Sequence, residues 1–174
     1  GAARTKPMKG TRPRGADANS DAALREELAL SEKDKAENLM IVDLMRNDLS
    51  RVAEAGSVTV DEPFKVESFP TVHQMVSTVR GDLKPDAGLA DIVQALFPCG
   101  SITGAPKIRA MELIDRLERD ARGPYCGAIG AYGADRRARF NVAIRTMAAR
   151  DDGHFEMGAG SGLVFDSAVS PEYD

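Results

Sequence analysis

The sequence predicts an α+β fold with antiparallel β-sheet. Two observations carry this prediction. Helical periodicity and helix-capping signals mark several segments in the first two thirds of the chain. Four short strand-like segments then follow one another near the end, at 125–132, 139–149, 154–159 and 162–166. Strands grouped apart from helices, rather than alternating with them, are typical of α+β proteins with antiparallel pairing.

Each earlier element has a local signal of its own. Ser31 followed by Asp34 resembles a capping box, with Asp in place of the usual Glu or Gln, and starts a helix. Apolar residues at i, i+3, i+4 and i+7 from Leu89 predict a helix with one buried face. Runs of β-branched and other apolar residues predict strands. Helices are expected at 20–29, 32–48, 89–96 and 106–118, and further strands at 57–60, 65–68 and 72–80.

Composition places the chain among ordinary globular proteins. Its 174 residues are 43% hydrophobic and 29% charged, enough to bury a core in one domain without a linker. The net charge of −4 argues against a general nucleic-acid binder. No apolar run approaches the roughly 20 residues that span a membrane, and no secretory signal is visible. Two cysteines, Cys99 and Cys126, do not amount to a disulfide framework, so a reducing cytoplasm is expected.

The stretch from Pro98 to Lys107 is the most informative in the chain. Small and turn-forming residues, among them Gly100 and Gly104, lie directly ahead of an amphipathic run, and Pro106 suits the first turn of a helix. The N–H groups and the positive dipole end of such a helix favour an anion, and Lys107 adds a full positive charge. A P-loop is excluded, because its lysine directly follows the second glycine. The stretch predicts a carboxylate or phosphate site, with an empty glycine-rich connection as the alternative.

Lys9 is a candidate nucleophile. An amine must lose its proton to attack, so its pKa has to be depressed, and the positive charges of Arg12 and Arg14 would lower it if they lie close in space. The alternative is a solvated basic arm, which is the usual role of such a cluster.

Two further polar features are candidates for binding. Asp34 and Glu37 are three residues apart and therefore share a helix face, although exposed carboxylates at this spacing usually have no special role. Arg145 lies in a predicted strand between Ile144 and Thr146. Its guanidinium can hold a carboxylate through two hydrogen bonds, or it can form an ordinary ion pair.

Several blocks of sequence accompany the stretch at 98–107 in a fixed order. They are PMKGTRPRG at 7–15, AENLMIVDLMRNDL at 36–49, GPYCG at 123–127, AIRT at 143–146, GAGSG at 158–162 and DS at 166–167. Together they resemble the chorismate-utilising enzymes, which include anthranilate synthase component I, aminodeoxychorismate synthase component I, and the isochorismate and salicylate synthases. The resemblance implies large antiparallel sheets with helices packed outside and a site in a cleft between them. It also implies that residues 1–174 are the C-terminal part of the catalytic domain, truncated at both ends.

The resemblance implies a Mg²⁺-dependent enzyme whose catalytic residue is Lys9. In the family, the glutamate that heads the block beginning at Glu37 binds Mg²⁺, as do two glutamates three residues apart near the C-terminus. Glu37 and Glu172 are therefore expected metal ligands, and the partner of Glu172 would fall beyond Asp174. Asp34 is expected at most to support the ligands. Mg²⁺ prefers such oxygen donors and can bridge them to a substrate carboxylate.

The resemblance also implies which residues bind chorismate. Tyr125 and Arg145 are expected to hold a chorismate carboxylate, assisted by backbone amides of the turn at 160–162. The full expected set is Thr103, Gly104, Ala105, Lys107, Tyr125, Arg145, Gly160, Ser161 and Gly162.

Three features favour one branch of the family. Aminodeoxychorismate synthases often have a lysine at the position of Lys9, where anthranilate synthases usually have alanine. The sequence Ser101-Ile102-Thr103 points the same way, since anthranilate synthases more often have Thr-Leu-Ser. Relatives that eliminate pyruvate tend to have histidine where this chain has Gln74. The neighbouring His73 should point to the opposite face of its strand.

The resemblance therefore implies aminodeoxychorismate synthase component I, a cytoplasmic enzyme of p-aminobenzoate and folate synthesis. It would convert chorismate and ammonia into 4-amino-4-deoxychorismate, with ammonia supplied by a glutaminase subunit or domain. The alternative within the family is anthranilate synthase component I. The alternative of another class is a non-catalytic fragment that binds anions or oligomerises through exposed surfaces.

Overall fold

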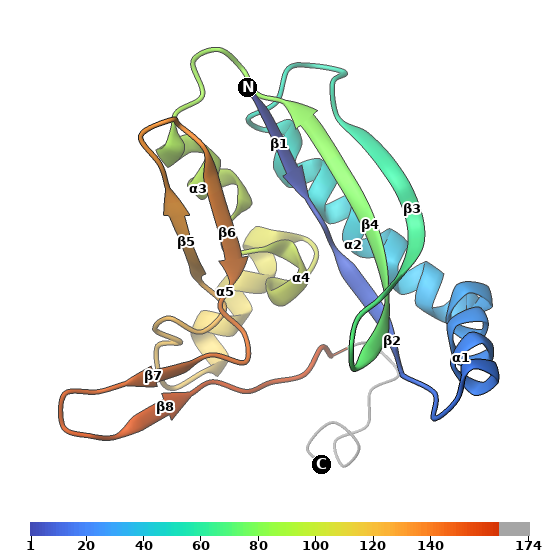
Figure 1. Cartoon of the computed structure of the whole chain (residues 1–174). Coiled ribbons are helices and arrows are strands. Elements are labelled where there is room, and N and C mark those ends of the chain that lie inside the picture. The colour runs from blue at the N-terminus through green and yellow to red at the C-terminus, as the bar shows by residue number, and fades with distance from the viewer. Residues whose placement is uncertain (164–174) are drawn as a thin grey trace. The chain divides into compact units, whose positions relative to one another are not determined.

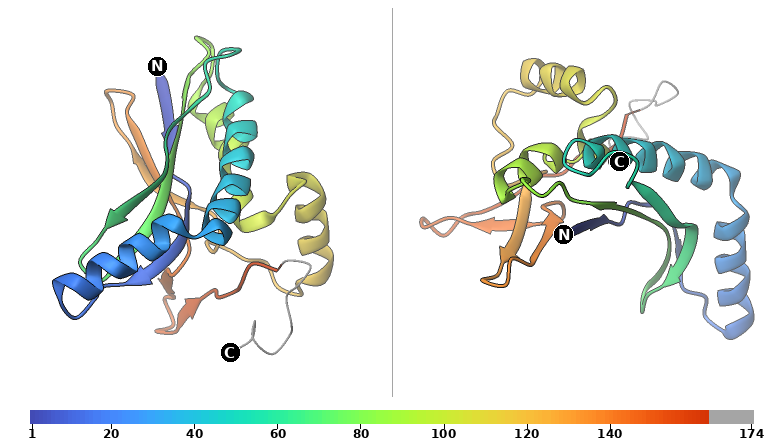
Figure 2. Two further views of the ribbon diagram at one scale, coloured as in Figure 1. Left: turned by 90° about the vertical axis from the view of Figure 1, so that its right-hand side faces the viewer. Right: turned by 90° about the horizontal axis from the view of Figure 1, so that it is seen from above.

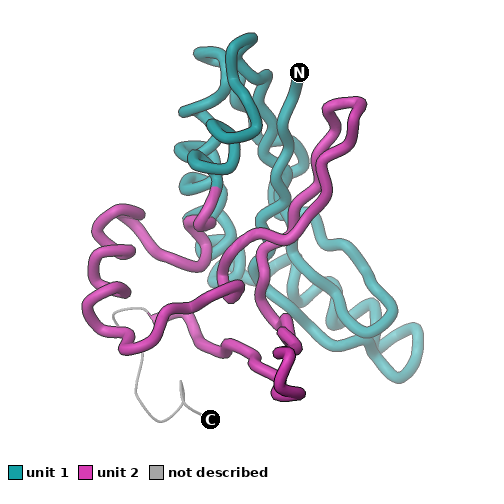
Figure 3. The backbone as a smooth tube through the Cα atoms, turned by 90° about the vertical axis from the view of Figure 1, so that its left-hand side faces the viewer, with its two compact units in different colours: residues 1–96 teal, residues 97–174 magenta. Residues whose placement is uncertain are grey.

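The computed structural model describes residues 1–163 of the chain. Contacts within the chain divide it into two compact units, Gly1–Leu96 and Phe97–Asp174 (Figure 3). Each unit has its own helices and its own antiparallel strand pairs (Figure 1). The mixed helical and antiparallel content confirms the predicted α+β class.

The first unit is organised around one central strand, β4 (Val72–Asp82). Val79 is paired with Thr5 of β1 and with Val60 of β3 at the same time, so β1 and β3 lie on opposite edges of β4. Gln74 is likewise paired with both β2 and β3, which places β2 on the edge that β1 occupies. The bounds of these strands are Ala2–Thr5 for β1, Met8–Pro13 for β2 and Thr59–Ser68 for β3.

Helices cover one face of this sheet (Figure 2). The helices of the unit are α1 (Ala18–Leu30), α2 (Glu32–Ser50) and α3 (Leu89–Leu96). Odd-numbered residues of β4 face α1 and α2, since His73 bonds to α1, Ser77 bonds to α2, and Gly81 lies against Leu49 of α2. This packing buries a core that includes Leu28, Ile41, Val42, Met45, Leu49, Met75 and Val79.

Side-chain caps define where α1 and α2 begin. The Asp17 carboxylate accepts hydrogen bonds from the N–H groups of Asn19 and Ser20, at 2.9 and 3.0 Å. The Ser20 hydroxyl accepts from the Asp17 N–H at 3.2 Å, which completes a capping box. Ser31 ends α1 and caps α2, because its hydroxyl accepts from the Asp34 N–H at 3.2 Å. The cap predicted at Ser31 is confirmed.

Most elements of the first unit agree with the sequence prediction. The helices expected at 20–29, 32–48 and 89–96 are confirmed, and so is the strand expected at 72–80. The two short strands expected before it are one strand, β3, interrupted by an irregularity between Asp61 and Lys65. The prediction misses β1 and β2, whose charged residues mask any alternation of apolar side chains. Their pairing with β4, rather than their local propensity, makes them strands.

Asn38 is a polar residue in the core between α2 and β4. Its fully buried side chain donates to the Met75 carbonyl oxygen at 3.3 Å and accepts from the Ser77 hydroxyl at 2.6 Å. The Ser77 hydroxyl oxygen also accepts from the Phe64 N–H at 3.0 Å. Because buried polar groups need partners, these bonds favour one register of α2 on the sheet.

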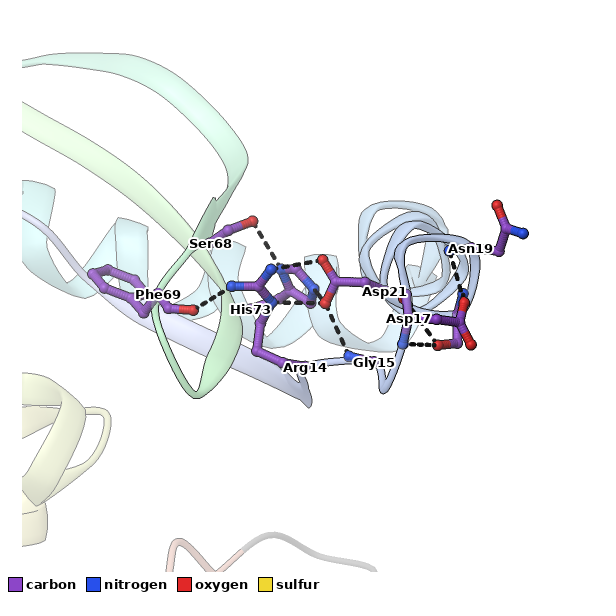
Figure 4. Close-up of polar contacts among 9 residues, drawn as sticks. Arg14, Gly15, Asp17, Asn19, Asp21, Ser68, Phe69 and His73 are labelled. Atoms are coloured by element: carbon purple, nitrogen blue, oxygen red, sulfur yellow. Dashed lines mark hydrogen bonds and ion pairs between the residues drawn. The ribbon is translucent and has the colours of Figure 1, made fainter.

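A second polar network fastens α1 to the sheet (Figure 4). The Asp21 carboxylate accepts from Nε and Nη2 of Arg14 at 2.7 and 2.8 Å, and its Oδ1 lies 3.0 Å from Nε2 of His73. Nδ1 of the fully buried His73 lies 2.8 Å from the Ser68 hydroxyl. Arg14 also donates to the Phe69 carbonyl oxygen at 2.8 Å. The network joins the segment after β2, the first turn of α1 and the hairpin between β3 and β4.

The second unit contains two helices and two separate two-stranded sheets. The helices are α4 (Gly100–Thr103) and α5 (Lys107–Leu117), and β5 (Ala128–Tyr132) pairs with β6 (Ala138–Val142), as β7 (Met147–Ala149) does with β8 (Phe155–Met157). The rings of Phe97 and Phe140 meet edge to face, with centroids 6.1 Å apart, and connect the start of this unit to β6. No helix in residues 1–163 is long and apolar enough to cross a membrane.

The strand predictions near the end of the chain need two corrections. The strand expected at 139–149 is two strands, β6 and β7, and Arg145 lies in the bend between them with a φ of +51°. β6 ends its pairing with β5 at Val142, and the chain then pairs with β8 from Met147 onward. Because the chain changes its partner strand between these residues, Arg145 is not in a strand despite the β-propensity of its neighbours. Of the strand expected at 162–166, residues 162–163 are not in a strand, and the others lie outside the described residues.

Replacing Asn38 with Ala should lower the free energy of unfolding by about 2–3 kcal/mol, because the change leaves a cavity and removes two buried hydrogen bonds. Urea denaturation followed by circular dichroism measures this. Asn47→Ala is the matched control, since Asn47 is exposed on the same helix and should cost less than about 0.5 kcal/mol. Equal effects of the two substitutions would contradict a structural role for Asn38.

Asp21→Asn should lower stability at neutral pH and flatten its dependence on pH in acid. Hydrogen bonds from Arg14 and from the Gly15 N–H hold the pKa of Asp21 well below its ordinary value. The folded state is therefore stabilised above the ordinary carboxyl pKa, and this contribution is lost as the pH falls below about 4. Thermal melts between neutral and acid pH measure it, with the exposed Asp86→Asn as control. If Asp21→Asn still lost stability steeply in acid, other groups would be the cause of that loss.

Candidate functional site

Lys9 lies in an irregularity of β2. The register passes from Met8 opposite Val76 to Thr11 opposite Gln74, so two residues of β2, Lys9 and Gly10, stand against one residue of β4. Gly10 has a φ of +89°, a backbone conformation that favours glycine. The half-buried Lys9 therefore leaves the regular ladder of the sheet, as residues next to functional sites often do.

The first turn of α2 packs against this bulge. A Cβ atom on Gly10 would lie 3.0 Å from atoms of the Asp34 side chain, so only glycine lets strand and helix approach this closely. Nη2 of Arg12 also donates to the Asp34 carboxylate at 3.1 Å. Glu37 follows Asp34 by about one helical turn and is half-buried. The structure thus brings the bulge that carries Lys9 to the helix that carries Glu37.

Arg12 and Arg14 do not act as bare charges beside Lys9. Arg12 is paired with Glu27 at 2.8 Å as well as with Asp34, and Arg14 is paired with Asp21. The hydrogen bond to Glu27 is the main reason that the pKa of Arg12 is raised. Carboxylates therefore balance the charges of both guanidinium groups and fasten the basic arm to the helices.

Glu37 has the chemistry of a Mg²⁺ ligand. Its carboxylate is half-buried and forms no ion pair within residues 1–163, so its hard oxygen atoms are available. No group of three potential ligands among His, Cys, Asp and Glu gathers anywhere in that range. The second expected ligand, Glu172, lies outside the described residues. Asp34 is held by Arg12, which leaves it next to the helical turn that carries Glu37.

His73 and Gln74 point to opposite faces of β4, as the alternation of strand side chains requires. His73 is buried under α1, where Asp21 and Ser68 contact both of its ring nitrogens. Gln74, half-buried, is opposite Thr11 of β2 and Glu67 of β3. His73 is therefore a structural residue of the network in Figure 4, and the face that Gln74 occupies has no histidine at that position.

The stretch at 98–107 is partly helical rather than a plain loop. Its middle forms α4, whose last residue, Thr103, donates its hydroxyl hydrogen to the Cys99 carbonyl oxygen at 3.2 Å. Gly104 follows with a φ of +129°, and a Cβ there would lie 3.1 Å from Ala110. The exposed Ala105 then leads to Lys107, the first residue of α5.

The beginning of α5 has the backbone chemistry of an anion site. Pro106 precedes the helix as its N-cap and supplies no side-chain hydrogen bond to the first turn. The first backbone bond of the helix runs from the Ala110 N–H to the Pro106 carbonyl oxygen, at 3.0 Å. The earlier N–H groups and the half-buried Lys107 thus lie at the positive end of the helix dipole.

Tyr125 and the glycines after β8 lie together. A Cβ on Gly158 would overlap the ring of Tyr125, and one on Gly160 would lie 3.1 Å from its hydroxyl oxygen. Burial raises the pKa of Tyr125, so its hydroxyl stays protonated at neutral pH and can donate to a carboxylate. A pocket of about 520 Å³ lies beside it, lined in part by Thr103, Tyr125 and Cys126 over apolar Pro98, Met111 and Ile114.

The remaining expected residues are not brought to this pocket. Arg145 is exposed in its bend, and its guanidinium forms no ion pair within the described chain. Ser161 and Gly162 are also exposed, and no atom lies within 4 Å of a Cβ built on Gly162. Lys9 and Glu37 belong to the first unit, whereas the expected carboxylate-binding residues belong to the second.

Two residues that the sequence does not predict to be part of the site, Arg122 and Gly158, contact Tyr125 in the second unit. Arg122 contacts Glu118, the Ile102 carbonyl oxygen and the ring of Tyr125. The spacing of Glu118 and Arg122, four residues apart with opposite charges, is the signal that could have found this contact. Gly158 begins the block GAGSG, yet nothing in its sequence shows that an aromatic ring packs on it.

The chain is similar to curated proteins over almost its whole length. Aminodeoxychorismate synthase component 1 of Klebsiella aerogenes is 53% identical over 97% of this chain and 37% of its own length. An anthranilate synthase component 1 of Haloarcula marismortui is 48% identical over 97% of this chain and 33% of its own length. The chain therefore spans about a third of the length of these relatives.

Solved structures share the fold. Anthranilate synthase component I from Streptococcus pneumoniae superposes with a TM-score of 0.82 at 38% identity, over 99% of this chain and 38% of that one. A 2,3-dihydroxybenzoate-specific isochorismate synthase from Bacillus anthracis gives a TM-score of 0.79 at 25% identity, over 99% and 45%. The sequence model described as "chorismate binding enzyme" matches residues 1–174. The chain belongs to the chorismate-binding enzyme family.

Proposed function

We propose that this chain takes part in the amination of chorismate to 4-amino-4-deoxychorismate, the reaction of an aminodeoxychorismate synthase component I. The observation that carries the proposal is Lys9, a half-buried amine in a bulge of β2 against α2, the helix of Glu37. The 53% identity to the Klebsiella aerogenes aminodeoxychorismate synthase component 1 supports it.

Lys9 would act as a nucleophile. Its neutral amine forms a bond to C2 of chorismate while the bond between C4 and the hydroxyl breaks, and the hydroxyl leaves as water after taking up a proton. Ammonia then bonds to C4, the bond between C2 and nitrogen breaks, and Lys9 recovers its free amine. The sum replaces one hydroxyl by an amino group and releases one water.

The other expected residues would bind and orient the substrate. Tyr125 would donate its hydroxyl hydrogen to a chorismate carboxylate, and the first turn of α5 with Lys107 would attract negative charge. The exposed guanidinium of Arg145 could take a carboxylate in two hydrogen bonds. Mg²⁺, held by Glu37 and Glu172, would offset substrate charge and assist departure of the hydroxyl.

Ammonia would come from a glutaminase partner or domain. We place the reaction in the cytoplasm, as part of p-aminobenzoate and folate synthesis.

Anthranilate synthesis is the second candidate, and its support is the 48% identity to the Haloarcula marismortui anthranilate synthase component 1. Two features of the first unit favour amination without elimination of pyruvate. Lys9 provides an amine nucleophile, and the face of β4 that holds Gln74 has no histidine there to move a proton. A non-catalytic anion-binding fragment is the candidate of another class.

The first test identifies the product. The protein expressed from the full reading frame that encodes this chain is incubated with chorismate, Mg²⁺ and ammonium chloride. The products are then separated and identified by mass spectrometry. Accumulation of 4-amino-4-deoxychorismate is expected. Accumulation of anthranilate would support the second candidate instead. Absence of both products, together with no Mg²⁺-dependent chorismate binding by calorimetry, would favour the non-catalytic fragment.

Lys9→Ala should reduce the rate of aminodeoxychorismate formation at least about a hundredfold, because the covalent route loses its nucleophile. Steady-state rates with ammonium measure the loss, and intact-protein mass after rapid quenching tests for a chorismate-derived adduct that needs Lys9. Lys6→Ala is the matched control, since Lys6 lies three residues earlier and pairs with Glu67 at the surface. Full activity of Lys9→Ala would rule out the covalent role.

A further inference from the structure

Arg122 makes three different contacts within the second unit. Its Nε and Nη2 donate to the two carboxylate oxygens of Glu118 at 2.8 and 2.6 Å, which is a bidentate pair. Its Nη1 donates to the Ile102 carbonyl oxygen of α4 at 3.4 Å. Its Cζ lies 5.7 Å from the ring centroid of Tyr125. One guanidinium group therefore connects the residue that ends α5, the helical turn of α4 and Tyr125.

The charge of Arg122 is already used within the protein. The hydrogen bonds to Glu118 are the main cause of its raised pKa, so the guanidinium stays charged, and the adjacent carboxylate offsets that charge. The side chain is 26% exposed. Arg122 is thus not suited to bind a substrate anion directly, although it borders the same pocket as Thr103 and Tyr125.

The backbone after β8 also packs against Tyr125. Gly158 approaches the ring so closely that a Cβ atom would overlap it, and Gly160 approaches the hydroxyl oxygen. Because Arg122 stacks over the ring and the Gly158 and Gly160 backbone lies against it, the ring has little freedom to turn. A fixed ring holds the tyrosine hydroxyl in one direction, which matters for binding a carboxylate at a defined angle.

We propose that Arg122 is a positioning residue that holds Tyr125 and α4 in the orientation from which the tyrosine hydroxyl contacts the substrate carboxylate. The inference rests on the proposed function, in which Tyr125 binds chorismate. Lysine cannot replace arginine here, because an ammonium group lacks the planar fork that reaches Glu118, the Ile102 carbonyl and the aromatic ring together.

The kinetic test uses a double-mutant cycle in the full reading frame. Arg122→Gln and Tyr125→Phe should each raise the KM for chorismate about tenfold, the effect of losing one hydrogen bond to a charged group, and should leave kcat within about threefold. If Arg122 acts through Tyr125, the double variant should be no worse than either single variant. Arg122→Lys should resemble Arg122→Gln. The exposed Arg116→Gln on α5 is the matched control and should match the wild type.

Two kinetic results would overturn the inference. One is an unchanged KM in Arg122→Gln. The other is a double variant whose KM defect is the product of the two single defects, since independent effects multiply. A lowered melting temperature of Arg122→Gln without a change in KM would show that the residue only stabilises the fold.

A second readout does not depend on chorismate. Because the Tyr125 ring packs on Gly158, the α-protons of Gly158 should be shifted upfield by the ring current in the wild-type spectrum of this chain. Arg122→Gln should move these resonances toward ordinary glycine values, and Arg116→Gln should not. If the shift persists in Arg122→Gln, Arg122 does not position the ring. If the wild type fails to use chorismate, the proposed function falls, and this spectrum still decides the placement of Tyr125.

Discussion

The packing of α2 against β4 is the contact on which the first unit depends. β4 is paired along both edges, and Met75, Ser77 and Val79 are buried where the helices cover it. A strand enclosed in this way cannot slip by one residue, since a slip would turn every side chain to the wrong face. Asn38 also forms hydrogen bonds to this strand, and they are satisfied in the same register. They therefore specify the register of helix and strand more sharply than hydrophobic packing alone would. The bulge of β2 at Gly10 then meets the first turn of α2, so the position of Lys9 follows from this packing.

Some charged side chains of the first unit form ion pairs that stabilise the fold, and others are left for a functional role. Arg12 and Arg14 are paired with carboxylates of α1 and α2, and these pairs turn a basic stretch into an ordered edge of the sheet. Lys9 and Glu37 differ from these neighbours, because neither has an ion-pair partner within residues 1–163. An amine and a carboxylate without ion-pair partners are groups that a charged substrate or a metal ion can use.

In the second unit, the close approach of glycine backbone fixes the positions of neighbouring groups, as buried hydrogen bonds do in the first unit. Gly104 provides the backbone conformation that separates α4 from α5, and Gly158 lets the Tyr125 ring lie directly on the chain. Each glycine lacks a Cβ atom at a position where a Cβ would collide with a side chain or disfavour the backbone conformation of the turn. Arg122, which forms a bidentate pair with Glu118, also lies over the tyrosine ring. These contacts act together on one phenol group, which is the expected donor to a substrate carboxylate.

The α+β class, the family, and the helices with local caps or apolar periodicity can be recognised from the sequence alone, as at Ser31 and in 89–96. These features depend on neighbours within a few residues, and such neighbours are visible in the sequence. Three features depend on the tertiary structure: the basic N-terminal segment forms two strands that pair with β4, Arg145 lies in a bend, and Arg122 and Gly158 both contact Tyr125. Strand pairing, the approach of a ring to a glycine and the partner of a charged group join residues that are distant in the sequence. No local propensity encodes which of them meet.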